Sequence, residues 1–182
     1  LRNSSAASDV YKRQLKTFAG IVIILLTVGV YGSTDYQPTT FIKDTKLIGS
    51  LHQNNEVEMF LGIPFAVPPI NDLRWEKPIA WTPENKKEIT ANKFRAACIQ
   101  NQRIVNWYKR LILDFGSDPR TFDIPEFSED CLYLNLWRPR ELKNNLPVIV
   151  YIHGGSNKAG WAYEPNYHGH NIANKGLSLI HI

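Results

Sequence analysis

The sequence predicts an α/β fold, because strand-like and helix-like patterns alternate along it. Residues 148–152 (VIVYI) are continuously apolar and mostly β-branched, which is typical of a strand covered on both faces of a sheet. Residues 132–137 (LYLNLW) alternate leucines with other side chains, the period-two pattern of a second strand. Residues 103–115 (RIVNWYKRLILDF) repeat apolar side chains at three- and four-residue steps, which indicates an amphipathic helix.

Local signals place the remaining elements. Residues 57–61 (VEMFL) predict a strand that ends at Gly62 and Pro64, because proline fixes φ and lacks an amide donor. The strand at 148–152 begins after Pro147, where no sheet donor is lost. Residues 166–176 (NYHGHNIANKG) predict the start of a crossover helix. The apolar face of the helix at 103–115 consists of Ile104, Tyr108, Leu111 and Phe115.

The composition is that of a globular protein of about one domain, with 43% hydrophobic and 12% aromatic residues. The formal net charge of +4 alone would suit a nucleic-acid or acidic-membrane partner. However, the basic residues form no stripe, and no aromatic residues interleave them in a repeat. We therefore expect no nucleic-acid partner.

The two ends of the chain are related in an unusual way. One allowed coding of residues 9–14 (DVYKRQ), read on the opposite strand, encodes residues 177–182 (LSLIHI). That DNA resembles the transposon end used to prepare sequencing libraries, and the preceding SSAAS resembles the rest of the same adaptor. We therefore expect residues 1–14 and 177–182 to be adaptor-encoded, and exclude them from fold prediction.

Residues 15–176 carry 18 basic and 16 acidic residues, so this exclusion lowers the net charge from +4 to +2. On this interpretation the reading frame was cut at both ends, and we expect the chain to be a piece of a longer protein.

Residues 15–32 predict an export segment. A lysine precedes an apolar run from Phe18 to Val30, and the small residues Gly32 and Ser33 follow it. The run is shorter than the roughly 20 residues of a membrane-spanning helix and fits a signal-peptide core. A cleaved signal peptide and an uncleaved membrane anchor both stay open. Either implies export, so we expect a secreted or periplasmic protein.

Cys98 and Cys131 are the two cysteines of the sequence. In an exported chain an even count favours a disulfide, worth roughly 3–4 kcal/mol in the chain-entropy model. Two buried free thiols are the alternative. The sequence contains no CxxC motif and no pair of histidines at helical spacing, so it predicts no metal site.

Four motifs occur in order: GIPFAVPP, LRWEKP with Trp81 close behind, SEDCLYLNLW and LPVIVYIHGG. Together, over residues 60–175, they resemble the amino-terminal part of a type-B carboxylesterase, the cholinesterase-like branch of the α/β-hydrolases. The resemblance implies a small antiparallel sheet that leads into a mostly parallel, helix-flanked central sheet. It makes residues 33–176 a partial domain of that family.

The resemblance also implies roles for particular residues. It supports a disulfide between Cys98 and Cys131, and a structural ion pair between Arg74 and Glu129. Two solvated charges are the alternative for that pair, since most surface pairs contribute little.

Hydrolysis in the family uses a Ser-acid-His triad whose serine lies on a G-x-S-x-G elbow. No such pattern lies between Leu15 and Gly176, so we expect the whole triad downstream and no catalytic residue in this chain. His153 and Asp130 are not expected to substitute for it. The family's chemistry requires no cofactor and no metal.

By the same resemblance, Gly154, Gly155 and Ser156 form the oxyanion-hole loop. Backbone N–H groups at about 2.7–3.1 Å stabilise the charge that develops on an ester carbonyl oxygen, and small residues let the substrate approach them closely. The donors would be the N–H groups of Gly155 and Ser156, with Ser156 in place of the family's third glycine. Asn157 replaces an aromatic residue of many relatives. A purely structural turn is the alternative, and we expect His153 to be structural.

These inferences predict an exported serine hydrolase of small-molecule carboxylic esters. The chain would carry the oxyanion loop but not the triad, so we expect the chain as given to be inactive and to fold poorly by itself. A non-catalytic, neuroligin-like adhesion protein is the alternative, and a decayed gene is a third possibility.

Overall fold

The computed structural model describes residues 36–83, 87–141 and 145–182. The predicted adaptor segment at 1–14 and the predicted export segment at 15–32 lie outside these residues, so both stay predictions. Residues 37–182 form one compact unit. Within the described ranges, no helix is both long and apolar enough to cross a membrane.

Short strands dominate the described part of the chain. In chain order, the elements are β1 (Thr39–Ile42), β2 (Thr45–Ile48), β3 (Ser50–Leu51), β4 (Val57–Pro64), η2 (Asn71–Leu73), β5 (Glu88–Thr90), β6 (Ala97–Cys98), α2 (Arg103–Asp114), η3 (Pro119–Thr121), β7 (Phe127–Ser128), β8 (Tyr133–Pro139), β9 (Val148–Tyr151), η4 (Pro165–Tyr167), α3 (His170–Ala173) and β10 (Ser178–His181).

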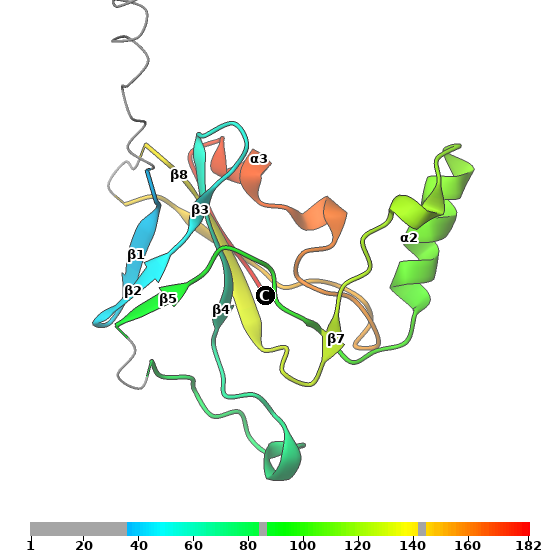
Figure 1. Ribbon diagram of the computed structural model, residues 1–182, viewed down its shortest axis with the longest axis horizontal. Helices are drawn as coiled ribbons and strands as arrows, with labels where there is room; N and C mark the ends of the chain where they lie inside the picture. Colours follow the sequence, from blue (N-terminus) through cyan, green and yellow to red (C-terminus); the bar gives the residue numbers. More distant parts are fainter. Residues whose placement is uncertain (1–35, 84–86, 142–144) are drawn as a thin grey trace, which may run out of the picture. The chain divides into compact units, whose positions relative to one another are not determined.

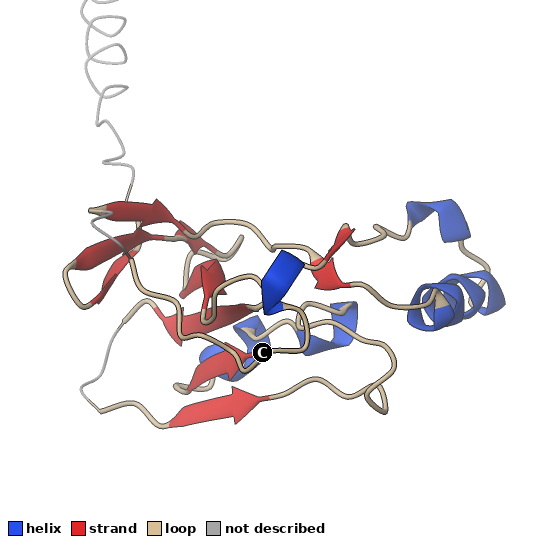
Figure 2. Ribbon diagram, turned by 90° about the horizontal axis from the view of Figure 1, so that it is seen from below, coloured by secondary structure: helices blue, strands red, loops and turns tan. Residues whose placement is uncertain are grey.

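The largest sheet has the strand order β3-β4-β8-β10-β9 (Figures 1 and 2). Its first four strands pair antiparallel, and β9 pairs parallel with β10. The expected antiparallel portion is therefore present and leads into one parallel pair. Two smaller sheets, β1-β2-β5 and β6-β7, complete the described strands.

Apolar clusters pack on both faces of β4 and β8. On one face, Phe60 of β4 contacts Leu47 of β2, so the small sheet β1-β2-β5 covers this side. On the other face, Val57 of β4 and Trp137 of β8 pack with Ala173 of α3. Figure 1 shows the small sheet and α3 on opposite sides of β4 and β8. The core is therefore layered, with the antiparallel strands in the middle.

The strand predicted over residues 57–61 is present as β4 and ends at Pro64, as expected, but the prediction that Gly62 helps to end it was wrong. β4 continues to Pro64, with a β-bulge between Phe60 and Ile63. At the bulge Gly62 has a φ of 73°, and its N–H group donates to Oδ1 of Asn135 over 2.9 Å. A glycine can adopt this positive φ, so it bends the strand here instead of stopping it.

The alternating strand was predicted correctly and forms β8. Asn135 and Trp137 are buried on one face, while Leu134 and Leu136 pack against the cluster that contains Phe60. Both faces of β8 are therefore covered.

The prediction that residues 148–152 are covered on both faces was wrong for the described part of the chain. The side chains of Val148, Val150 and Ile152 are 56%, 56% and 72% exposed, and those of Ile149 and Tyr151 are 39% exposed. β9 is the edge strand and pairs with β10 alone. A parallel strand is covered where helices pack on it. Among the described helices, η4 contributes one ring contact to β9, between Tyr167 and Tyr151 with centroids 5.2 Å apart, and this contact leaves the other β9 side chains exposed.

The predicted helix is confirmed as α2, which lies between the two cysteines. Its predicted apolar face was partly wrong. The helix buries Val105 and Tyr108, and Phe115 is 80% exposed. The contacts of Val105 and Tyr108 are with Trp161 and other apolar side chains near the amino-terminal half of the helix, so periodicity alone overestimated the packed length.

The predicted crossover helix is present as the short helix α3, and residues 178–181 follow it as β10, between β8 and β9. The prediction that residues 177–182 are adaptor-encoded stays open. Any short apolar segment rich in β-forming residues can pair with a free strand edge. The pairing of β10 therefore does not distinguish adaptor-encoded residues from residues of the protein itself.

Candidate oxyanion loop and adjoining cavity

The loop after β9, residues 153–160 (HGGSNKAG), turns back on itself. The N–H groups of Lys158 and Ala159 donate to the carbonyl oxygen of Gly155 over 3.1 and 3.3 Å. Gly155 has a φ of 132°, and a Cβ atom there would lie 1.6 Å from the carbonyl oxygen of Ala159. Position 155 therefore requires glycine.

The end of this loop returns to its beginning at Gly160. Gly160 is buried and has a φ of 115°. A Cβ atom there would lie 2.5 Å from the carbonyl oxygen of Gly154 and 2.7 Å from Nδ1 of His153. A displacement of Gly160 would therefore be transmitted directly to the first glycine of the loop.

The predicted donors are available. In the described part of the chain, the N–H groups of Gly155 and Ser156 donate to no protein acceptor. Ser156 and Asn157 have φ values of 59° and 54°, a left-handed conformation that costs a residue with a Cβ atom roughly 1 kcal/mol. Two successive unpaired donors suit a developing oxyanion. The assignment of Gly154, Gly155 and Ser156 to an oxyanion hole stays a prediction.

A cavity of about 560 Å³ lies beside these donors. Gly155 and Ser156 line it from the loop, and Ile104, Trp107 and Tyr108 line it from α2. The cavity thus combines backbone donors with apolar and aromatic walls and a few polar side chains, among them Arg103 and Glu164, as small-molecule sites usually do.

A buried carboxylate holds the far side of the loop. Glu164 is 5% exposed and accepts hydrogen bonds from the Tyr108 hydroxyl over 3.0 Å and from the Trp161 N–H group over 3.2 Å. Burial, and then the charge of Glu164, raise the pKa of Tyr108, so the phenol stays a protonated donor. Sequence reasoning missed Glu164, because no spacing pattern marks an isolated acid before a proline.

Gln100 is a second residue that sequence reasoning missed. Its side-chain amide bonds the backbone of Gly160, sixty positions along the chain. The sequence signal that could have drawn attention to it is its place two residues after Cys98.

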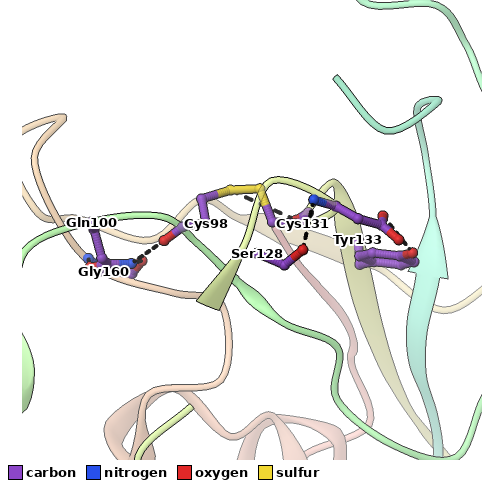
Figure 3. The surroundings of a disulfide bond; sticks show 7 residues. Cys98, Gln100, Ser128, Cys131, Tyr133 and Gly160 are labelled. Atoms are coloured by element: carbon purple, nitrogen blue, oxygen red, sulfur yellow. Dashed lines mark hydrogen bonds between the residues drawn. A yellow bond between two sulfur atoms is a disulfide. The ribbon is translucent and has the colours of Figure 1, made fainter. Parts of the chain in front are cut away.

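The structure joins Cys98 to Cys131 by a disulfide that closes the segment containing α2 (Figure 3). Nε and Nη2 of Arg74 donate to the two carboxylate oxygens of Glu129 over 2.5 and 2.6 Å. The hydrogen bonds from Arg74 lower the pKa of Glu129. Both side chains are partly exposed and neither lines the cavity, so this pair lies apart from the candidate site.

His153 and Asp130 make local hydrogen bonds. Nδ1 of His153 lies 2.8 Å from the carbonyl oxygen of Gly154, and Asp130 accepts from the Tyr133 hydroxyl over 2.7 Å. Across the described ranges, no cluster of three or more histidine, cysteine or acidic side chains could hold a metal ion.

Comparisons with known proteins identify the family of the chain. Residues 37–182 match the carboxylesterase family. Fumonisin B1 esterase of Sphingopyxis macrogoltabida is 31% identical over 189 aligned positions, which cover 98% of this chain and 32% of that protein. Carboxylesterase 5A of Mus musculus is 35% identical over 150 positions, covering 78% of this chain and 24% of that protein.

Among solved structures, a PNB esterase matches with a TM-score of 0.64 and 28% identity, over 81% of this chain and 27% of that one. The chain therefore spans about a third or less of the length of these relatives. The matching structures are esterases of the α/β-hydrolase fold, and the mixed sheet described above is a part of that fold. The chain belongs to the carboxylesterase family.

Proposed function

We propose that the chain is the amino-terminal part of an exported serine hydrolase that cleaves small-molecule carboxylic esters. The observation that carries this proposal is the pair of unpaired N–H groups on Gly155 and Ser156 beside the 560 Å³ cavity. The family match supports ester hydrolysis as the chemistry.

In this proposal the ester carbonyl enters the cavity with its oxygen toward the two N–H groups. Attack by a nucleophilic serine moves negative charge onto that oxygen, and the N–H groups stabilise the charge more in the transition state than in the ground state. The turn at Gly155 fixes the direction of the donors before the substrate arrives. The nucleophile, the acid and the histidine would come from the downstream part of the longer protein.

Ser156 sets this loop apart from the family's three-glycine pattern. It keeps the backbone N–H group that the chemistry uses, and its side chain is exposed at the cavity. The added Cβ and hydroxyl reduce the space beside the reacting carbonyl. We therefore propose that Ser156 restricts which acyl groups fit, without removing the donor.

Two observations support export. The apolar run from Phe18 to Val30 fits a signal-peptide core, and a disulfide joins Cys98 to Cys131. The protein would accordingly be secreted or periplasmic, with a membrane anchor as the other arrangement that this run allows.

The test uses the full-length protein encoded by the intact gene. It should release p-nitrophenol from short-chain p-nitrophenyl esters, and the activity should disappear when the elbow serine is changed to alanine. The 182-residue chain should show no turnover. A residue other than serine at the centre of the elbow would contradict the proposal and favour a neuroligin-like, non-catalytic protein. Turnover by the 182-residue chain, abolished by a serine-directed organophosphate, would contradict the downstream location of the triad.

A further inference from the structure

We propose that Gln100 is a positioning residue for the oxyanion loop, and that the disulfide at Cys98 and Cys131 holds Gln100 in place. This inference rests on the proposed function of the loop. It concerns a residue outside the loop that touches neither the predicted donors nor the cavity.

The amide group of Gln100 is fully used. Its Oε1 accepts from the Gly160 N–H group over 2.6 Å, and its Nε2 donates to the Gly160 carbonyl oxygen over 2.8 Å. Nε2 also lies 3.1 Å from the carbonyl oxygen of Cys98, to which it donates. Figure 3 shows Gln100 and Gly160 beside the disulfide. One side chain thus bonds both backbone groups of a loop residue, as a neighbouring strand would.

Gly160 is the residue through which this contact can reach the donors. It packs so closely against Gly154 that a Cβ atom at position 160 would lie 2.5 Å from the Gly154 carbonyl oxygen. Gly155, the first donor, follows immediately and is itself bonded back to Ala159 through its carbonyl oxygen. A shift of Gly160 would therefore displace the donors.

The other end of the loop has weaker support in the described part of the chain. It continues from β9, an edge strand that pairs with β10 alone and whose faces are exposed. Gln100, by contrast, follows β6, which pairs with β7, and lies two residues from the disulfide. The segment around Gln100 is thus covalently tied to the chain just before β8. The better-anchored end of the loop is the one that Gln100 holds.

The chemistry of the contact requires an amide. Two carbonyl oxygens, of Cys98 and Gly160, need donors, and one N–H group needs an acceptor. Glutamate has almost the same shape but would place a carboxylate oxygen against the two carbonyl oxygens. Methionine has a similar length and supplies no strong hydrogen-bonding group.

The kinetic test compares Gln100→Glu and Gln100→Met with wild type in the full-length protein, with a short-chain p-nitrophenyl ester as substrate. We expect kcat to fall about 10- to 100-fold in both variants, because misplaced oxyanion donors weaken transition-state binding. KM should change less than about threefold, since the cavity walls are untouched. Gln102→Glu is the matched control: Gln102 is exposed, makes no side-chain cap and should keep the wild-type kcat.

Hydrogen exchange on the same proteins tests the contact without relying on activity. In wild type the Gly160 N–H group should be protected, although it lies outside any helix or strand. Exchange at Gly160 should accelerate about tenfold or more in Gln100→Met, because the acceptor is lost. Gln102→Glu should leave it unchanged.

These measurements separate the two proposals. If wild type hydrolyses no ester, the proposed function fails, and exchange at Gly160 still decides whether Gln100 holds the loop. An unprotected Gly160 in wild type would overturn the inference even if both variants misfold. Faster exchange with an unchanged kcat would also overturn it, because Gln100 would then hold the loop without positioning the donors.

Discussion

The two sides of the main sheet differ in how completely the described chain packs them. β4 and β8 are covered on both faces, by β1-β2-β5 on one side and α3 on the other. β9, at the far edge of the same sheet, has apolar side chains that stay exposed on both faces. The apolar core on the antiparallel side is therefore complete within the described residues. β9, in contrast, has the sequence of a buried strand but lacks the side-chain contacts that would bury it.

This difference matters because the candidate oxyanion loop, residues 153–160, joins the two sides. The loop begins at His153, just after β9. It ends at Gly160, whose backbone is hydrogen-bonded by Gln100 of the segment that the disulfide closes. Changes on the antiparallel side should therefore affect stability first, and changes at β9 should report on whatever covers it in the full-length protein. The predictions below concern that protein and run from the largest expected effect to the smallest.

The buried ion pair on the antiparallel side should give the largest effect. Nε of Arg138 lies 2.6 Å from Oε2 of Glu58, with side chains 17% and 1% exposed. Arg138→Met would leave the buried carboxylate without this cation, which should cost about 3–5 kcal/mol. Arg110→Met, at an exposed pair with Asp114, should cost less than about 1 kcal/mol. Urea-unfolding midpoints measure both, and equal costs would contradict the account of a complete core.

A pair of matched valine substitutions should test the two sides directly. Val57→Thr in β4 keeps the side-chain shape but buries a hydroxyl, at a cost of roughly 1–3 kcal/mol. We expect Val150→Thr in β9 to cost about as much, because a continuous run of apolar, β-branched residues is typical of a strand that is covered on both faces. Thermal and urea unfolding of both variants measure these costs. A Val150→Thr cost near zero, beside a normal cost for Val57→Thr, would show that β9 is exposed in the full-length protein as well.

Relief of the left-handed backbone in the loop should give a smaller effect. Ser156 has a φ of 59°, which glycine adopts without strain. Ser156→Gly should therefore stabilise the protein by up to about 1 kcal/mol. Ser156→Ala keeps the Cβ atom and should not. If the alanine variant gains as much thermal stability as the glycine variant, backbone strain is not the cause.

The pH dependence of the surface ion pair should be the smallest effect. Hydrogen bonds from Arg74 lower the pKa of Glu129 below its unfolded value of about 4.3. The contribution to stability is therefore present above pH 4.3 and is lost as the pH falls through the folded pKa. The stability difference between wild type and Glu129→Gln should shrink from pH 7 to pH 3. A difference that grows with acidity would contradict this sign.

The sequence predicted the elements better than their surroundings. The alternation in β8 and the periodicity of α2 are local properties, and both elements formed where expected. The exposure of β9 could not be predicted from its sequence. An apolar run indicates that a strand is suited to burial, but it does not show whether the elements that would cover the strand lie among the described residues. Gly62 was misjudged because glycine both ends strands and forms bulges, and only the pairing with β8 distinguishes these.

The candidate site was predictable where it depends on backbone chemistry. The family resemblance placed Gly154, Gly155 and Ser156 in this loop, and the structure adds that the geometry at Gly155 excludes any side chain. The role of the loop stays a prediction. Gln100 and Glu164 were not predictable, because their partners lie at Gly160 and Tyr108, and sequence spacing carries no signal for such contacts across the fold.

The most direct test of the central claim, that this loop supplies the oxyanion donors, compares two alanine substitutions at adjacent glycines in the full-length protein. In Gly155→Ala the new Cβ atom would collide with the Ala159 carbonyl oxygen, whereas in Gly154→Ala it would meet no described atom within 4 Å. We predict that kcat for p-nitrophenyl ester hydrolysis falls about 100-fold or more in Gly155→Ala and much less in Gly154→Ala. Equal kcat values in the two variants, with unchanged thermal midpoints, would contradict the claim.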